Sequence, residues 1–186
     1  MNVSGTQKGL TIDTGKRAKF KKFGLIFLLF LGLDQISKIL VHKFYGINPH
    51  QSYEVIGDFF RITVIENPGA VFGISFGSAS LNQTIFTIFS IVAIIVIVLL
   101  FRKSEHPLSD WGFTLILSGA VGNLLDRISR GAVIDFLDFD FPDFIMERWY
   151  MFNIADSCIV IGVIMLVIYY VFVEKSSKKN LCREKE

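Results

Sequence analysis

Cysteine and histidine are scarce in this chain, and neither is clustered. The 186 residues include two cysteines, and the three histidines are scattered at His42, His50 and His106. Cys158 falls inside an apolar run and Cys182 in the basic C-terminal tail. The topology that the charges predict puts these two cysteines on opposite sides of a membrane, which excludes a disulfide between them. Because no metal-site spacing is present either, we predict a protein without a metal or any other cofactor.

Internal repeats and low-complexity linkers are also absent. Many transporters are built from two repeated halves, and the halves of this chain are not related in that way. The net charge of +2 says little by itself, because the basic residues are segregated along the sequence. We therefore expect one integral membrane domain over residues 1–186 that does not bind nucleic acid.

Long apolar runs dominate what is present. The chain is 52% hydrophobic and contains 19 phenylalanines, and a transmembrane helix needs about 20 mostly apolar residues. Four stretches meet this length, at 23–44, 83–101, 111–128 and 154–173. The first is not a cleaved signal peptide, since Asp34 and Lys38 interrupt it and no small-x-small site follows. We predict an all-α membrane protein with four transmembrane helices.

The distribution of lysine and arginine predicts the orientation of these spans. Basic residues crowd the two tails, 1–22 and 174–186, and the link between the second and third spans. The segments 45–82 and 129–153 carry few. The positive-inside rule therefore places both termini in the cytoplasm, with the tails near anionic membrane lipids.

The outer segments predict the non-helical structure. Two β-rich runs within 53–65 flank Gly57-Asp58, which favours a hairpin turn. We expect a small sheet on the outer membrane surface, between the first and second spans. The outer loop 129–153 begins with a strand-like run and then becomes aromatic, with Trp149 and Tyr150 suited to the headgroup level.

Polar residues at membrane depth are candidates for function. Asp34 and Lys38 lie four apart and share a helix face. They either neutralise each other, so that the helix tolerates both, or act directly. Gly119, Asn123 and Arg127 share a face of the third span at the same spacing. Either the glycine permits close packing with polar contacts beside it, or Asn123 and Arg127 point into a polar cavity near the outer surface.

Asp156 stands where the fourth span begins, and two interpretations of it remain open. With Asn153 as N-cap, Asp156 is the third helical residue, which resembles a capping box. Alternatively, Asp156 acts together with Asp135, an acid within an apolar run on the same side of the membrane. Asp135 in turn either faces water, as the nearby Asp138 and Asp140 would, or folds back against Asp156.

Two carboxyl groups in contact at a partly dry site have distinct chemistry. They hold one proton between them, because both cannot ionise cheaply. The ionised member accepts a proton from water, and the protonated member donates to the carbonyl oxygen of a peptide bond. We expect Asp156 to be ionised, since the helix dipole favours its charge, and Asp135 to carry the proton. Such a pair hydrolyses peptides without a metal or a covalent intermediate.

Five short motifs occur in order along the chain. They are DQISK at 34–38, NPGAVFG at 67–73, GAVGNLLDR at 119–127, VIDF at 133–136 and FNIADS at 152–157. Together they resemble the boxes of the prolipoprotein signal peptidases, also called signal peptidase II. The resemblance runs from the first span to the fourth and leaves out only the tails.

The resemblance implies an intramembrane aspartic endopeptidase of the bacterial cytoplasmic (inner) membrane, with its active site near the extracytoplasmic face. Such enzymes remove the signal peptide from prolipoproteins, just before a cysteine that carries diacylglycerol. The resemblance makes Asp135 and Asp156 the catalytic residues. It assigns substrate-binding or supporting roles to the matching polar and glycine positions, namely Asp34, Lys38, Asn67, Gly119, Asn123, Arg127 and Asn153. The implied partners are prolipoproteins and membrane lipids, and we expect a monomer.

Two features depart from the family pattern. Val71 stands where the family more often has alanine, and an acidic insert around Asp140–Asp143 lengthens the last loop. The insert leaves open whether Asp138 substitutes for Asp135.

Two functions from other classes remain as alternatives. In a small transporter or proton channel, Asp34, Lys38 and Arg127 would form a polar path through the membrane. A non-catalytic factor would bind lipoproteins without cleaving them.

Overall fold

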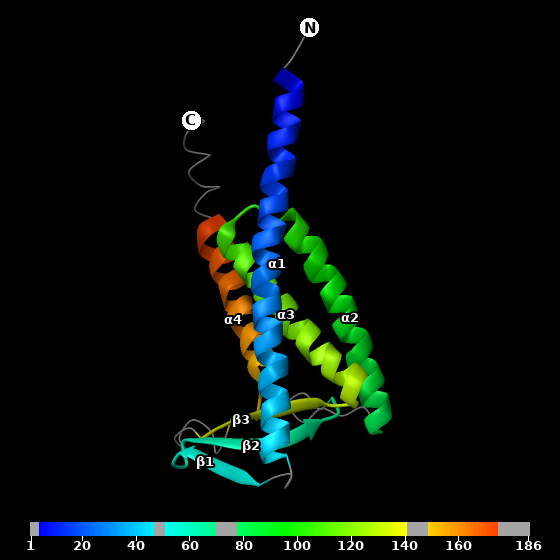
Figure 1. Ribbon diagram of the computed structural model, residues 1–186, viewed down its shortest axis with the longest axis vertical. Coiled ribbons are helices and arrows are strands. Elements are labelled where there is room, and N and C mark those ends of the chain that lie inside the picture. Colours follow the sequence, from blue (N-terminus) through cyan, green and yellow to red (C-terminus); the bar gives the residue numbers. More distant parts are fainter. Residues whose placement is uncertain (1–3, 47–50, 70–77, 141–148, 175–186) are drawn as a thin grey trace.

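Four long helices stand over a small sheet at one end of the molecule (Figure 1). The computed structural model describes residues 4–46, 51–69, 78–140 and 149–174. The helices are α1 (Ser4–Tyr45), α2 (Ala79–Lys103), α3 (Pro107–Arg130) and α4 (Ile154–Ile168), which continues as a π-helix, η1 (Tyr169–Val173). The strands are β1 (Ser52–Ile56), β2 (Phe60–Asn67) and β3 (Val133–Phe139).

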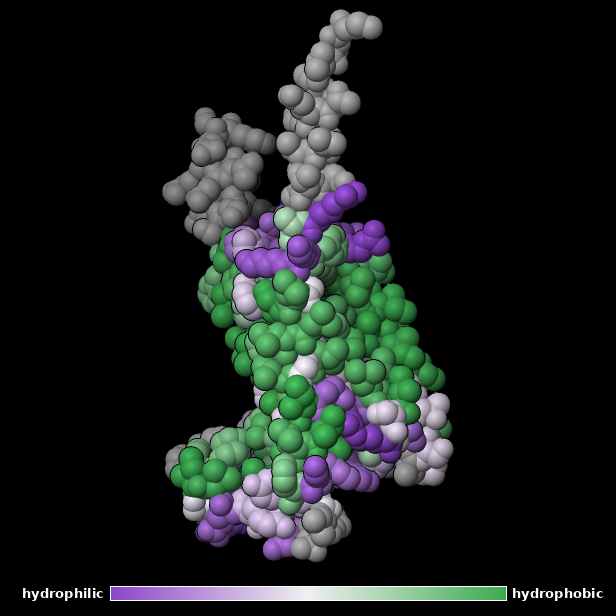
Figure 2. Space-filling view, viewed as in Figure 1, coloured by the Kyte–Doolittle hydropathy of each residue, from purple (hydrophilic) through white to green (hydrophobic). Residues whose placement is uncertain are grey.

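Three helical stretches in the described part of the chain are long and apolar enough to cross a membrane. They are Arg17–Tyr45, Ser80–Lys103 and Ile154–Val173, and they confirm the predicted first, second and fourth spans. Figure 2 shows the broad apolar band that these helices present between two polar ends. The chain is therefore a multi-pass membrane protein.

Helix α3 is the central helix of the bundle and packs against α1, α2 and α4. Its glycines allow very close contact with α4. A Cβ atom added at Gly119 would lie 2.2 Å from the carbonyl oxygen of Ala155, and one at Gly162 would lie 2.6 Å from that of Gly112. The packing interpretation of Gly119 is thus confirmed. Because its neighbours bury it, α3 can carry polar residues that lipid would not accept.

The starts of α2 and α3 differ from the predicted span starts because caps, not hydropathy, set them. Helix α3 begins four residues earlier than predicted, at Pro107, and the Nδ1 atom of His106 accepts the N–H of Leu108. Helix α2 begins at Ala79, after Ser78. Helix α1 extends back into the predicted tail, as far as Ser4.

Two apolar clusters sit at opposite ends of the bundle. One joins Val41 of α1 to the sheet residues Val64, Ile134 and Phe136. The other is aromatic, with Phe23, Phe101 and Phe113 in contact near the far end. The first cluster packs the sheet against α1, and it thereby sets the position of β3 along the axis of the helix bundle.

The sheet has the strand order β1-β2-β3 and is antiparallel throughout. The predicted hairpin is confirmed, with the chain reversing at residues 57–59 and Gly57 at φ 48°. The strand-like run predicted at the start of 129–153 is confirmed as β3, which follows α3 and pairs with β2. The sheet is therefore larger than the one predicted between the first two spans. A bulge in β2 between Ile62 and Ile65 re-aims the side chains beside β3.

Some sequence-based expectations concern parts of the chain outside the described residues. These are Val71 and most of the NPGAVFG motif, Asp143 with the rest of the acidic insert beyond Asp140, and the basic tail from Lys175 onward.

Candidate active site

Asp135 lies in the middle of β3 and is only 3% exposed. Two side-chain amides hold its carboxyl group. The Nδ2 atom of Asn67, at the end of β2, donates to Oδ2 at 3.1 Å. The Nδ2 atom of Asn153 donates to Oδ1 at 2.7 Å. Both oxygens thus have a donor within the protein, which fixes the direction in which the carboxyl group points.

Asp156 lies in the first turn of α4 and is partly exposed. It forms the predicted capping box with Asn153: its Oδ2 accepts the backbone N–H of Asn153 at 3.1 Å, and its own N–H donates to the Asn153 Oδ1 at 2.9 Å. The capping interpretation is confirmed, but it is not the whole role. The Nδ2 atom of Asn123 also donates to Asp156 Oδ1, at 2.8 Å.

Asn153 therefore contacts both acids, Asp135 through its side chain and Asp156 through its backbone N–H. The connection between β3 and α4 folds back, as one sequence interpretation required. Asp138 does not substitute for Asp135 in this contact with Asn153. It lies three residues further along β3, so its side chain is on the opposite face of the strand, where it accepts the hydroxyl of Thr63 at 2.7 Å.

Burial raises the pKa of the Asp135 carboxyl from 3.8 to about 7, and the negative charge of Asp156 adds to this. The amide donors of Asn67 and Asn153 and the charge of Lys38 oppose the rise in pKa without cancelling it. Asp135 is therefore protonated between pH 3.8 and about 7, where an ordinary aspartate is ionised. The two carboxyl groups titrate as a pair.

The shared proton has a consequence for stability. Between pH 3.8 and about 7 the folded chain binds more protons at Asp135 than the unfolded chain does, so stability falls as pH rises through this window. Asp135→Asn removes that dependence. We compare the melting temperature of the variant minus that of wild type at two pH values. This difference should be larger at pH 8.5 than at pH 5.5 by about 5 °C, because wild type loses stability over this range and the variant does not. A loss of 1 kcal/mol shifts the midpoint of such a chain by roughly 2–4 °C. Thermal unfolding in detergent measures it, and an equal difference at both pH values would contradict the pair.

The predicted pair of Asp34 and Lys38 is confirmed, with 2.9 Å between Lys38 Nζ and Asp34 Oδ2. Both side chains are essentially inaccessible, at 1% and 0% exposure. Asp34 also acts on α4, because its Oδ1 accepts the N–H of Ala155 at 2.9 Å. This N–H lies in the first turn of α4, where no intrahelical partner exists. Asp34 thus joins α1 to the start of the helix that carries Asp156.

Arg127 lies close to the acid pair. Within the described residues, it makes no direct hydrogen bond to either acid. Its Nη1 lies 3.3 Å from the carbonyl oxygen of Asn123 and 3.4 Å from the Ser90 hydroxyl of α2. Its charge interacts with those of Asp135 and Asp156. Its Nε is buried and has no hydrogen-bond partner within the described residues.

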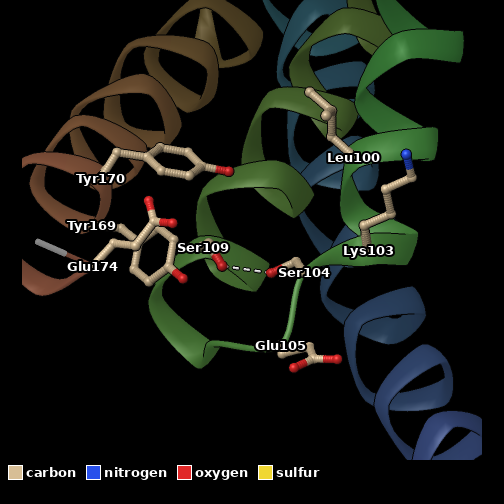
Figure 3. A pocket seen from close by; sticks show the side chains of 8 residues that line it. All are labelled: Leu100, Lys103, Ser104, Glu105, Ser109, Tyr169, Tyr170 and Glu174. Atoms are coloured by element: carbon tan, nitrogen blue, oxygen red, sulfur yellow. Dashed lines mark hydrogen bonds between the residues drawn. The ribbon is translucent and has the colours of Figure 1, made fainter. Parts of the chain in front are cut away.

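A pocket in the described residues lies elsewhere. It has a volume of about 230 Å³ and is lined by residues from the ends of α2 and η1 and the start of α3 (Figure 3): Leu100, Lys103, Ser104, Glu105, Ser109, Tyr169, Tyr170 and Glu174. Tyr169 lies 13 residues after Asp156, which is about 20 Å along a helix. The acid pair is therefore not in this pocket but at the opposite end of α4, beside the sheet.

The family whose members are described as signal peptidase (SPase) II matches residues 26–172 of this sequence. This match covers most of the chain and includes both acids. The chain belongs to the signal peptidase II family.

Individual relatives of the signal peptidase II family agree with this assignment. The lipoprotein signal peptidase of Moorella thermoacetica is 39% identical over 77% of this chain and 89% of its own. That of Clostridioides difficile is also 39% identical, over 83% of this chain and 97% of its own. A solved bacterial membrane enzyme is similar in structure, with a TM-score of 0.72 and 32% identity, covering 86% of this chain and 92% of its own.

Part of the buried network in this signal peptidase II chain was not predicted from the sequence. Asp126 is 0% exposed and lies 2.7 Å from Lys38 Nζ. It also pairs with Arg130 and accepts a hydrogen bond from Gln35. The signal was present, because Asp126 ends the GNLLD run and stands four residues before Arg130. Its position on the buried face of α3 is what only the packing reveals.

Proposed function

We propose that the chain is an aspartic endopeptidase that removes the signal peptide from diacylglyceryl-modified prolipoproteins, just before the lipidated cysteine. Asp135 and Asp156 are its catalytic residues. The observation that carries the proposal is the shared contact of the two acids with Asn153. Membership in the signal peptidase II family supplies the reaction class and the substrate class.

The two acids have different roles in the hydrolysis of the peptide bond. Asp156 accepts two hydrogen bonds, from Asn123 and from the backbone of Asn153, and both favour its ionised form. It takes a proton from a water molecule, whose oxygen attacks the carbonyl carbon of the scissile bond. Asp135 donates its proton to the carbonyl oxygen, and its raised pKa keeps that proton available near neutral pH. The intermediate then collapses: the C–N bond breaks, the leaving amine takes the proton that Asp156 accepted from water, and a hydroxyl of the intermediate returns a proton to Asp135.

Other residues bind the substrate backbone around this pair. The charge of the Arg127 guanidinium group interacts with those of both acids, and this group donates to a carbonyl oxygen of the unwound signal peptide. Asn67 and Asn153 set the direction of the Asp135 carboxyl group, while Gly119 lets α3 and α4 approach. An extended peptide at the membrane surface needs such donors, since its amides have lost their helical partners.

The site lies at one end of four membrane spans, with α3 as the fourth. Both termini are cytoplasmic, because the basic residues gather at that end. The sheet, at the lower end of the molecule in Figure 1, and the acid pair beside it lie at the extracytoplasmic face of the bacterial cytoplasmic membrane. There water reaches the scissile bond while the acyl chains of the substrate remain in lipid. The single domain works as a monomer. No observation favours the transporter or the non-catalytic factor.

The experiment is a cleavage assay with the purified wild-type chain in detergent. One peptide carries a diacylglyceryl cysteine after a signal sequence, and its control carries the same cysteine without lipid. Cleavage should occur directly before the lipidated cysteine, about 100-fold faster than in the control, because the lipid positions the scissile bond. A chelator should leave the rate unchanged. Mass spectrometry locates the cut, and absence of cleavage in the lipidated peptide would reject the proposal.

A further inference from the structure

We propose that Lys38 is a positioning residue for the catalytic pair. Its ammonium group fixes the orientation of the Asn123 amide, and that amide holds Asp156 in position to accept a proton. This inference rests on the proposed function and assigns to Lys38 more than the neutralisation of buried acids.

Three oxygen atoms surround the ammonium group of Lys38. It donates hydrogen bonds to Asp34 Oδ2 at 2.9 Å and to Asn123 Oδ1 at 3.0 Å, and it forms an ion pair with Asp126 Oδ2 at 2.7 Å. The residue is 0% exposed. Because water does not compete for it, the group stays in one place on α1 and acts across the contact with α3.

This contact decides which way the Asn123 amide points. An ammonium group can only donate hydrogen bonds, so the amide oxygen must face Lys38. The amide nitrogen then faces Asp156 and donates to it at 2.8 Å. The flipped amide would set N–H groups against the ammonium and its oxygen against the carboxylate, and both contacts are repulsive.

The second amide at the site is fixed in another way. The backbone N–H of Asp156 donates to Asn153 Oδ1 at 2.9 Å, which leaves Asn153 Nδ2 to donate to Asp135. Each acid is thus held by an amide whose own orientation depends on an obligatory donor. For Asp135 that donor is the helix backbone. For Asp156 it is Lys38, whose hydrogen bond to Asn123 Oδ1 is 3.0 Å long, with a second and longer one to the same oxygen from Asn153 Nδ2 at 3.2 Å. Of the two obligatory donors, only Lys38 can be removed by substitution.

A competing explanation is that Lys38 merely neutralises Asp34 and Asp126. Both carboxylates are buried, and an unpaired buried charge is strongly destabilising. Loss of activity in a Lys38 variant would then follow from loss of structure. The two explanations differ in whether the effect of Lys38 passes through Asn123.

A double-mutant cycle separates them. The variants are Lys38→Met, Asn123→Ala and their combination, with kcat and KM measured on the lipidated peptide. Each single change should lower kcat roughly 10- to 100-fold, as loss of a partner that orients an active group typically does, with little change in KM. The combination should be no slower than the slower single variant. Effects that multiply would overturn the proposal.

A charge-balanced variant keeps the test valid if Lys38→Met folds poorly. Adding Asp34→Asn removes one of the two carboxylates and leaves Asp126 paired with Arg130. An asparagine can still accept the N–H of Ala155, so the contact with α4 is retained. The double variant should recover most of the lost melting temperature but none of the lost kcat. Recovery of both would show that Lys38 acts only as a counter-ion.

Failure of this inference can be told apart from failure of the proposed function. If Asp156→Asn still cleaves at the wild-type rate, the catalytic assignment is wrong. If Asp156→Asn is inactive while Lys38→Met keeps its wild-type kcat, the assignment stands and only the positioning role of Lys38 is rejected.

Discussion

Asp135→Asn and Asp156→Asn should each abolish cleavage of a lipid-modified precursor while leaving the protein folded in detergent. Asparagine nearly matches aspartate in shape but can neither accept the proton of water nor supply a proton to a carbonyl oxygen. We expect kcat to fall by about 10³-fold or more, at the upper range for loss of a general acid or base. The measurement is kcat on the lipidated peptide under saturating conditions, with thermal unfolding as the test of folding.

Asp138→Asn is the matched control for this prediction. Asp138 lies in the same strand as Asp135, is 2% exposed and accepts the Thr63 hydroxyl. An asparagine oxygen can accept the same bond, so the variant should keep its rate within about twofold, as expected for a change outside the reacting groups. If Asp138→Asn is inactive and Asp135→Asn is active, Asp138 supplies the catalytic group in place of Asp135.

Gly119→Ala should be the most damaging single-methyl substitution in the bundle. The added Cβ would lie 2.2 Å from the carbonyl oxygen of Ala155 and 2.7 Å from Ile159 Cγ1, so α3 and α4 must move apart. Overpacking of this kind costs about 1–3 kcal/mol. Movement of the two helices separates Asn123 from Asp156, and a 1 Å displacement of a reacting group can cost about 10²-fold in rate. Thermal unfolding and kcat measured on one sample report both effects.

Gly32→Ala provides the comparison for Gly119→Ala. A Cβ added at Gly32, in α1, meets nothing within 4 Å. Alanine favours a helix over glycine by about 1 kcal/mol, so this variant should be as stable as wild type or more stable, with unchanged kcat. If Gly119→Ala behaves in the same way, the contact between α3 and α4 is not what positions Asp156.

Local sequence was sufficient for most of the helices and for the candidate residues. The apolar runs predicted four spans, and three of them are confirmed as helices long and apolar enough to cross a membrane, since a lipid-exposed stretch needs only length and apolarity. The capping box at Asn153 and Asp156 was also predictable, because it joins residues three apart in the chain. The same holds for Asp34 and Lys38, which one helical turn brings together. These are contacts of short range, and the chain cannot avoid them once the helix forms.

Tertiary structure decided how these parts act together. The sequence did not reveal that β3 joins the hairpin, because strand pairing depends on segments more than 60 residues apart. Nor did it reveal that Asn153 contacts both acids, or that Asp126 shares the ammonium of Lys38.

The amino-acid sequence by itself thus determined which segments become helices and which polar residues the membrane end of the bundle must hold. Only the packing of α1, α3, α4 and β3 decided which of these residues meet. The reason is physical. Helix formation depends on near neighbours along the chain. The position of a carboxyl group on one element relative to a neighbouring helix depends instead on glycine contacts, caps and strand register acting together.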